Sequence, residues 1–252
     1  MNHLQLEAVI SDLLNCGRFK DYAPNGLQVE GRAEVRRVVT GVTASQALLD
    51  AAVACQADAV LVHHGYFWGN EAPSIRGMKK RRLQTLLSHD INLYAYHLPL
   101  DAHPVVGNNA QLARQIDITV TGALDPQDPC CLILEGELSQ AMTGDALAQH
   151  LQQRLGREIL HCGDTAPTLI RRLAWCTGGG QGYLAQAAAS GVDAFITGEV
   201  SEQTIHIARE MGIHFYAAGH HATERYGIQA LGHWLMQTHG LDVQFIDIPN
   251  PA

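Results

Sequence analysis

Two adjacent histidines, His63 and His64, follow the apolar run 59–62 and precede Gly65. A short apolar run between polar boundaries predicts a buried strand, here in a parallel sheet. Open α/β sheets bind ligands beyond the carboxyl ends of their strands, and imidazole is a common metal ligand. The pair therefore indicates either a metal site or two loop histidines, one packed and one solvated, and the rest of the chain must decide between them.

Other side chains of the metal-ligand type follow further predicted strands. The whole set is His63, His64, His97, Asp101, Glu199, His220, His221 and Glu224. Imidazoles and carboxylates without cysteine form the ligand set expected for zinc, manganese or iron. Three members have another reading: His97 as a core histidine, Glu199 as a carboxylate at a helix N-terminus, and His221 as a surface or outer residue.

The spacing of these residues constrains how they could share ions. His220 and Glu224 are four positions apart, so a helix would place both on one face. His63 and His64 point to opposite sides of a regular strand and converge only if the strand breaks between them, which Gly65 permits. We therefore expect two neighbouring ions, one per imidazole, with a carboxylate between them. Paired ions about 3.5–4 Å apart are a common hydrolytic design.

Apolar periodicity predicts strands that alternate with helices. The predicted strands cover 36–42, 58–63, 91–96, 118–120, 131–137, 158–161, 172–176, 193–197, 213–217 and 243–248. The predicted helices cover 4–15, 45–55, 76–88, 108–116, 143–155, 181–190, 201–211 and a last segment that ends near 237. The segment 125–129 contains two prolines and two aspartates and predicts a linker or surface loop.

Three segments of the first half resemble three segments of the second half in the same order. The pairs are 40–41 with 177–178, 57–62 with 192–197, and 91–95 with 213–217. This internal repeat predicts a duplicated α/β unit with mixed, mostly parallel sheets and right-handed crossovers. Equivalent strands should end in equivalent places, so the ligand-type residues would line one shared cleft.

The composition fits a protein with a sizeable core and no membrane span. The 252 residues are 46% hydrophobic, and no apolar run approaches the roughly 18 residues that a spanning helix needs. The acidic residues and amphipathic spacing of the N-terminal segment lead us to expect no secretory signal there, and six cysteines without a CxxC motif predict reduced thiols of a cytoplasmic protein. A net charge of −8 disfavours binding of nucleic acid, and the basic run 79–82 is expected on a solvated helix face.

Five motifs together resemble those of the GTP cyclohydrolase 1 type 2 homologues, also called the Nif-three-like family. They are 22–31 (YAPNGLQVEG), 62–65 (VHHG), 97–101 (HLPLD), 197–199 (TGE) and 219–224 (GHHATE). The resemblance covers essentially the whole chain. It implies two intertwined α/β lobes related by duplication, which we place at 1–124 plus 225–252 and at 125–224.

The resemblance also implies a toroidal homohexamer with a dinuclear metal site in the cleft between the lobes. Residue by residue, the implied ligands are His63, His64, Asp101, His220 and Glu224. Glu224 would bridge the two ions. The metal could be zinc, iron or manganese, and the resemblance does not settle the reaction.

The leading hypothesis is a cytoplasmic, metal-dependent hydrolase that uses two divalent cations per subunit. Its substrate would be a small nucleotide-like or phosphorylated molecule, and His97 and Glu199 could transfer protons. The alternative is a non-catalytic ring in which the metals hold the lobes together, for a partner protein or a metal cargo. A nucleic-acid-binding ring is a third reading, which the charge weakens.

Overall fold

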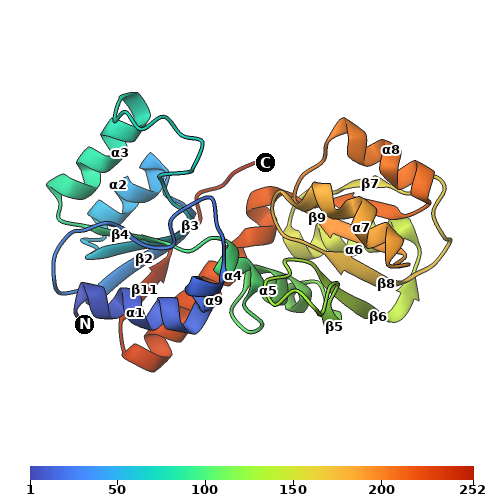
Figure 1. Cartoon of the computed structure of the whole chain (residues 1–252), viewed down its shortest axis with the longest axis horizontal. Coiled ribbons are helices and arrows are strands. Elements are labelled where there is room, and N and C mark those ends of the chain that lie inside the picture. The colour runs from blue at the N-terminus through green and yellow to red at the C-terminus, as the bar shows by residue number, and fades with distance from the viewer. The chain divides into compact units, whose positions relative to one another are not determined.

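The computed structural model describes residues 1–252 and contains two compact units, each built around its own β-sheet (Figure 1). The first unit comprises Met1–Leu100 and Ile228–Ile248. The second comprises Asp101–Gly227 and Pro249–Ala252. Residues 101–124, which the sequence analysis assigned to the first lobe, therefore pack with the second unit.

The first unit has a five-stranded sheet in the order β1-β4-β3-β2-β11. Its strands are β1 (Gly26–Val29), β2 (Arg37–Thr43), β3 (Ala59–His64), β4 (Asn92–Ala95) and β11 (Asp242–Phe245). Its helices are α1 (His3–Leu14), η1 (Cys16–Arg18), α2 (Gln46–Ala54), α3 (Gly77–Ser88) and most of α9 (His220–His239). Only the edge strand β1 is antiparallel to its neighbour, so the predicted parallel arrangement is confirmed for this sheet.

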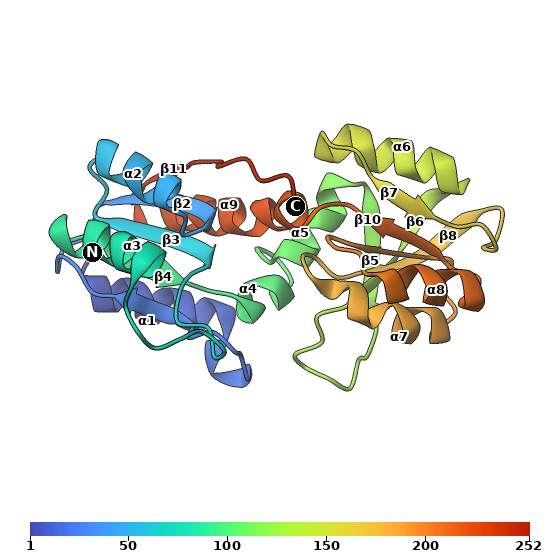
Figure 2. The same cartoon turned by 90° about the horizontal axis from the view of Figure 1, so that it is seen from above.

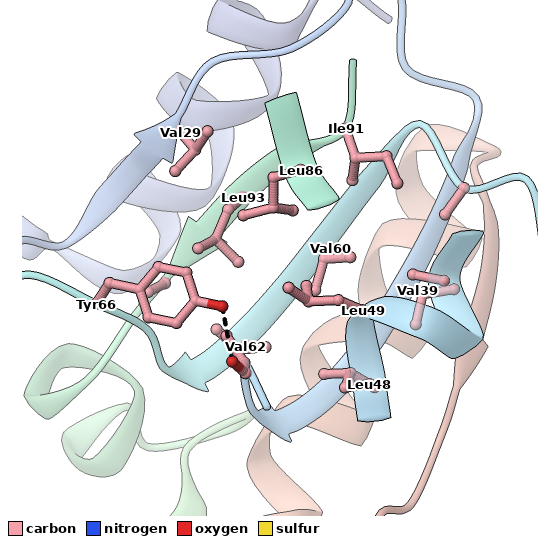
Figure 3. Close-up of a cluster of buried hydrophobic side chains, with 14 of the residues drawn as sticks. Val29, Val39, Leu48, Leu49, Val60, Val62, Tyr66, Leu86, Ile91 and Leu93 are labelled. Atoms are coloured by element: carbon pink, nitrogen blue, oxygen red, sulfur yellow. Dashed lines mark hydrogen bonds between the residues drawn. The ribbon is translucent and has the colours of Figure 1, made fainter. Parts of the chain in front are cut away.

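Helices cover both faces of this sheet, with α2 and α3 on one face and α1 and α9 on the other (Figure 1). Side chains alternate along each strand, so Val60 and Val62 of β3 pack against Leu48 and Leu49 of α2 (Figure 3). Tyr66 closes this cluster and donates a hydrogen bond to the Ala44 carbonyl (2.8 Å). A fully covered parallel sheet explains why the strand before the two histidines is apolar throughout.

The second unit has a six-stranded mixed sheet in the order β5-β6-β8-β9-β10-β7. Its strands are β5 (Ile118–Ala123), β6 (Leu134–Met142), β7 (Leu160–Cys162), β8 (Ile170–Trp175), β9 (Ala194–Thr197) and β10 (His214–Ala217). Its helices are α5 (Asn108–Gln115), α6 (Gly144–Leu155), η2 (Gly180–Tyr183), α7 (Leu184–Ala189) and α8 (Glu202–Met211), and α4 (Leu98–Ala102) crosses the boundary of the units. Figure 2 shows α6 on one face of the sheet and α7 and α8 on the other.

This second sheet is less parallel than the sequence predicts. Its β8, β9 and β10 are parallel, whereas β5, β6 and β7 each join by antiparallel pairing. The segment 125–129 is a loop between the antiparallel neighbours β5 and β6, and not a linker between lobes. Proline and aspartate suit both kinds of connection, so composition cannot distinguish them.

The predicted duplication is confirmed in the order and pairing of the elements. The segment α1-β1-β2-α2-β3-α3-β4 has the sheet order β1-β4-β3-β2, and α6-β7-β8-α7-β9-α8-β10 has the matching order β7-β10-β9-β8. In register, Ala59 pairs with Asn92, and Ala194 pairs with His214. One of the three proposed sequence matches is shifted by two residues. Val38 pairs with Ala59, and Leu173 pairs with Ala194, so residues 40–41 correspond to 175–176 and not to 177–178.

Candidate metal centre

His63 and His64 are the last two residues of β3, and β3 continues through both of them. The predicted break between the histidines is therefore wrong, and the chain leaves the strand only at Gly65. The two rings still lie close, with centroids 4.4 Å apart and planes at 44°. His63 is fully buried and His64 is half-buried.

The backbone fixes the orientation of His63. Its Nδ1 lies 2.9 Å from the carbonyl oxygen of Tyr96, which can only accept a hydrogen bond. Nδ1 must therefore carry the proton in the neutral ring, and Nε2 keeps the lone pair. A histidine that donates one ring N–H to a backbone carbonyl or a carboxylate is the usual arrangement of a metal ligand.

His97 follows β4 and is oriented by a carboxylate. Its Nδ1 lies 2.9 Å from Oδ1 of Asp21, and its backbone N–H donates to Oδ1 of Asn25 (2.7 Å). Burial alone would raise the pKa of Asp21, but the hydrogen bonds from His97 and Asn25 outweigh it and lower that pKa to about 2. Asp21 is therefore ionised at neutral pH and accepts a hydrogen bond from Nδ1 of His97. Nε2 is then the ring nitrogen that remains for other contacts.

The first unit thus brings three imidazoles together. Ligand atoms of His63, His64 and His97 all lie within 4.8 Å of one another, so this group could hold a metal ion. The ring centroids of His63 and His97 are 5.2 Å apart, and those of His64 and His97 are 5.8 Å apart. Asp21 completes the cluster, although the sequence analysis did not name it.

The second unit contributes a group of His220, Glu224 and Glu199. His220 is the first residue of α9, and the helix places Glu224 one turn later, with 3.0 Å between Nε2 and Glu224 Oε2. The other ring nitrogen, Nδ1, lies 2.7 Å from Glu199 Oε1. Burial alone would lower the pKa of His220, but the two carboxylates outweigh it and raise that pKa to about 9. A cation beside Nε2 would take the place of the imidazolium proton.

Asp101 lies in α4 and is buried among polar partners. Its Oδ1 accepts hydrogen bonds from Asn108 (2.8 Å) and from the Thr177 hydroxyl (3.3 Å). Carboxylate oxygens of Asp101 and Glu224 lie within 4.8 Å of each other. Two buried carboxylates at this distance repel each other unless a proton or a cation neutralises them. Their proximity therefore fits a cation.

Gly178 leaves the space that Glu224 occupies. Its φ is +63°, and a Cβ at this position would collide with Glu224 Oε1. Two requirements therefore exclude other residues here: a left-handed backbone and the close approach of the carboxylate. The Gly178 N–H donates to the Thr223 hydroxyl (3.0 Å), which ties the glycine turn to the start of α9.

The structure places every predicted residue except His221 in one of two sets, one in each unit. His63, His64 and His97 form the group of the first unit, and Asp101, Glu199, His220 and Glu224 lie in the second unit. His221 is buried, and its backbone N–H donates to the Ala252 oxygen (3.3 Å). Asp21, Asn108 and Thr177 are the polar partners that the sequence analysis missed, and the Asp21–Gly26 turn was the available signal for the first of them.

The fold and these groups define a mixed α/β protein with buried histidine and carboxylate clusters that could hold a metal ion. No helix is long and apolar enough to cross a membrane. The chain belongs to the Duf34/NIF3 (NGG1p interacting factor 3) family, whose model matches residues 1–251.

Relatives of similar length carry the description that the sequence motifs suggested. A Yersinia pestis protein is 67% identical to this chain, and an Escherichia coli K12 protein is 62% identical. Each alignment covers 100% of this chain and 100% of the relative. Both relatives are described as "GTP cyclohydrolase 1 type 2 homolog". The solved structure of ybgI, described as of unknown function, has a TM-score of 0.97 at 62% identity, with full coverage of both chains. TTHA1606 from Thermus thermophilus has a TM-score of 0.89 at 34% identity, again with full coverage.

Proposed function

We propose that the protein is a metal-dependent hydrolase that holds two divalent cations per subunit. The proposed ligands are His63, His64, Asp101, His220 and Glu224, with Glu224 shared by both ions. One observation carries the proposal: His63 and His220 each direct Nδ1 to an oxygen acceptor, as metal-ligating histidines do. His97 is oriented in the same way by Asp21.

The size and chemistry of the donor set support two ions. Catalytic zinc sites use three protein ligands and keep one open position, so five ligands exceed the need of one catalytic ion. Imidazoles and carboxylates suit zinc, iron and manganese alike. When bound, such ions supply Lewis-acid activation of water and positive charge beside the reacting group.

The remaining polar residues have separate tasks in this proposal. Asp21 holds His97, which can accept or donate a proton at Nε2. Glu199 holds His220 through Nδ1 and is itself held by the amide of Gln181 (3.1 Å). We assign a proton-transfer role to His97 and a positioning role to Glu199. The substrate is proposed to be a small nucleotide-like or phosphorylated molecule, as the description of the relatives suggests.

Elemental analysis followed by a hydrolysis screen tests the proposal. Wild-type protein purified without chelator should carry close to two equivalents of metal, and Glu224→Gln and His64→Ala should lose most of it. His206→Ala is the matched control, because His206 is exposed on α8 outside both groups. The screen should cover nucleoside phosphates and sugar phosphates. Full turnover in metal-free protein would contradict the proposal.

Burial of the ligands supports a second candidate, a ring in which the metals are structural. His63 is 0% exposed, Glu224 is 3% exposed and Asp101 is 7% exposed. Structural ions are commonly closed off from solvent in this way. Chelation distinguishes the two: loss of assembly without turnover in any substrate panel would favour the scaffold.

The assembly and the compartment complete the proposal. The family resemblance supports a toroidal homohexamer, which light scattering of the purified protein would test. All six cysteines are free thiols, which supports a reducing, cytoplasmic location. The net charge of −8 gives no support to a nucleic-acid partner.

A further inference from the structure

Two aromatic side chains stand beside the histidine group of the first unit. The rings of Tyr22 and Trp68 have centroids 5.7 Å apart and planes at 36°. Each ring meets the His97 imidazole edge-on at 5.0 Å, and Trp68 lies 5.9 Å from the His64 ring. Tyr22 is 62% exposed, and Trp68 is half-buried. Aromatic surface is therefore presented to solvent next to the candidate metal ligands.

Specific hydrogen bonds hold the two aromatic residues in place. The Trp68 indole N–H donates to the Gly65 carbonyl (3.3 Å), and the Gly69 N–H donates to the Tyr22 carbonyl (2.7 Å). The side chain of Gln28 donates to the Tyr66 carbonyl (3.1 Å) and accepts from the Tyr66 N–H (2.7 Å). The two loops that carry the rings are thus fixed to each other and to β1.

The backbone of Phe67, the residue before Trp68, has a strained conformation. Phe67 adopts φ +64°, a left-handed conformation that is rare for a bulky residue. Such strain persists where the surrounding structure enforces it, and it concentrates at functional sites. The Phe67 N–H donates to Glu71 (3.2 Å), and Lys79 lies 4.9 Å from the Phe67 ring.

We infer that Tyr22 and Trp68 form a stacking surface for a planar nitrogen heterocycle of the substrate. Their rings are too close together for a third ring to enter between them, so the ligand would stack on the exposed outer face. Aromatic side chains bind bases in this way because every base has a π-face. Because the Trp68 ring lies against His64 and His97, the rest of a molecule stacked on these aromatic rings would lie beside the metal ligands.

This inference rests on the proposed function and names the substrate as a nucleotide instead of a simple sugar phosphate. The test is the affinity of metal-loaded protein for AMP, GMP and ribose 5-phosphate, measured by calorimetry. Both nucleotides should bind at least roughly fivefold more tightly than ribose 5-phosphate. Trp68→Leu should weaken nucleotide binding by about five- to 150-fold and leave ribose 5-phosphate within about twofold.

Three further proteins make the test specific. Trp68→Phe keeps a ring and should retain part of the nucleotide affinity, and Tyr22→Leu gives a second deletion if Trp68→Leu does not fold. Trp234→Leu removes a partly exposed indole from α9 and should bind nucleotides as the wild type does. Metal content should be unchanged in all four variants.

Several outcomes would overturn the inference. Equal affinity of wild type for ribose 5-phosphate and the nucleotides would exclude stacking, and so would unchanged nucleotide binding in Trp68→Leu and Tyr22→Leu. A change in the mass of the assembly in these variants would identify the rings as a contact between copies instead. If metal binds and nucleotides do not, the inference fails and the metal centre stands; if nucleotides bind without turnover, only the hydrolase proposal fails.

Discussion

Three of the candidate histidines, His63, His97 and His220, are oriented by an oxygen on the Nδ1 side of the ring. Tyr96 supplies a carbonyl to His63, Asp21 a carboxylate to His97, and Glu199 a carboxylate to His220. These partners fix the plane of each ring and hold its Nδ1 proton before any cation arrives. A histidine ring that is already oriented loses little conformational freedom when it binds a metal ion. The residues that orient these rings should therefore contribute to metal affinity.

Removal of the Glu199 carboxylate tests this argument. Glu199→Ala should lower metal affinity by about 10- to 100-fold, because His220 loses the partner that orients its ring. A competition titration with a fluorescent chelator measures the effect. Glu202→Ala, at an exposed position of α8, is the matched control and should bind metal normally. Unchanged affinity in Glu199→Ala would show that His220 needs no such support.

For single residues, the sequence predicted that these histidines come together, but it did not predict the partners that orient them. His63, His64 and His97 come together because parallel strands end at one edge, which periodicity already predicts. Asp21 reaches His97 across 76 positions through a loop, and nothing in local spacing indicates such a contact. The course of β3 through both histidines was also not predictable, because Gly65 permits a turn without requiring one.

Among the elements, the duplicated unit repeats one hydrogen-bonding device at the start of two strands. Asp58 accepts from the N–H groups of Arg36 and Arg37, and Asp193 accepts from those of Arg171 and Arg172, all at 2.9 Å. Each aspartate precedes the strand β3 or β9 and fixes the start of its neighbour, β2 or β8. The repeat therefore extends to single atoms.

Asp58→Ala and Asp193→Ala should each destabilise the fold by about 1.5–3 kcal/mol, because hydrogen bonds to a charged acceptor are lost. Denaturant unfolding measures the change. Asp12→Ala, exposed on α1, should shift stability by less than about 0.5 kcal/mol. A neutral result at both strand starts would mean that water replaces the aspartates without loss.

His161 of β7 and His214 of β10 form a second pair of histidines, and their contact predicts that stability depends on pH. His214 Nε2–H donates to the Pro167 carbonyl (2.8 Å), so His214 Nδ1 accepts from His161 Nε2–H (3.0 Å). Burial, and then His214, lower the pKa of His161 below its ordinary 6.5, and Asp145 and Asp164 oppose this only in part. Below about pH 6.5, His161 therefore binds a proton more readily in the unfolded chain than in the folded chain. The folded state loses stability as the pH falls through this range.

His161→Gln keeps a donor for His214 and removes the titration. Its unfolding free energy should fall less steeply between pH 6.5 and 5 than that of the wild type. One proton accounts for at most about 1.4 kcal/mol per pH unit, and solvent screening reduces this further. His206→Gln should retain the wild-type slope, since His206 is exposed. Equal slopes in wild type and His161→Gln would remove His161 as the cause.

For the whole molecule, the sequence predicted the fold class, the duplication and the family, all of which the structure and the relatives confirm. Mixed sheets were expected, but local signals could not predict which strands of the second sheet are antiparallel, because β6 pairs with its neighbour β5 and also with the more distant β8. The division of the chain also differs from expectation, since 101–124 packs with the second unit through α5 and β5.

Metal should stabilise the whole chain if the proposed ligands act together, because they come from segments of both units. A ligand that binds only the folded state at 100 times its Kd adds about 2.7 kcal/mol. For a chain of this size, that should raise Tm by about 5–10 °C over chelator-treated protein. Differential scanning calorimetry with added zinc, manganese or iron measures the shift and shows which metal gives the largest. Glu224→Gln should show little response, and a wild-type Tm that is the same with saturating metal and with chelator would exclude a linked metal centre.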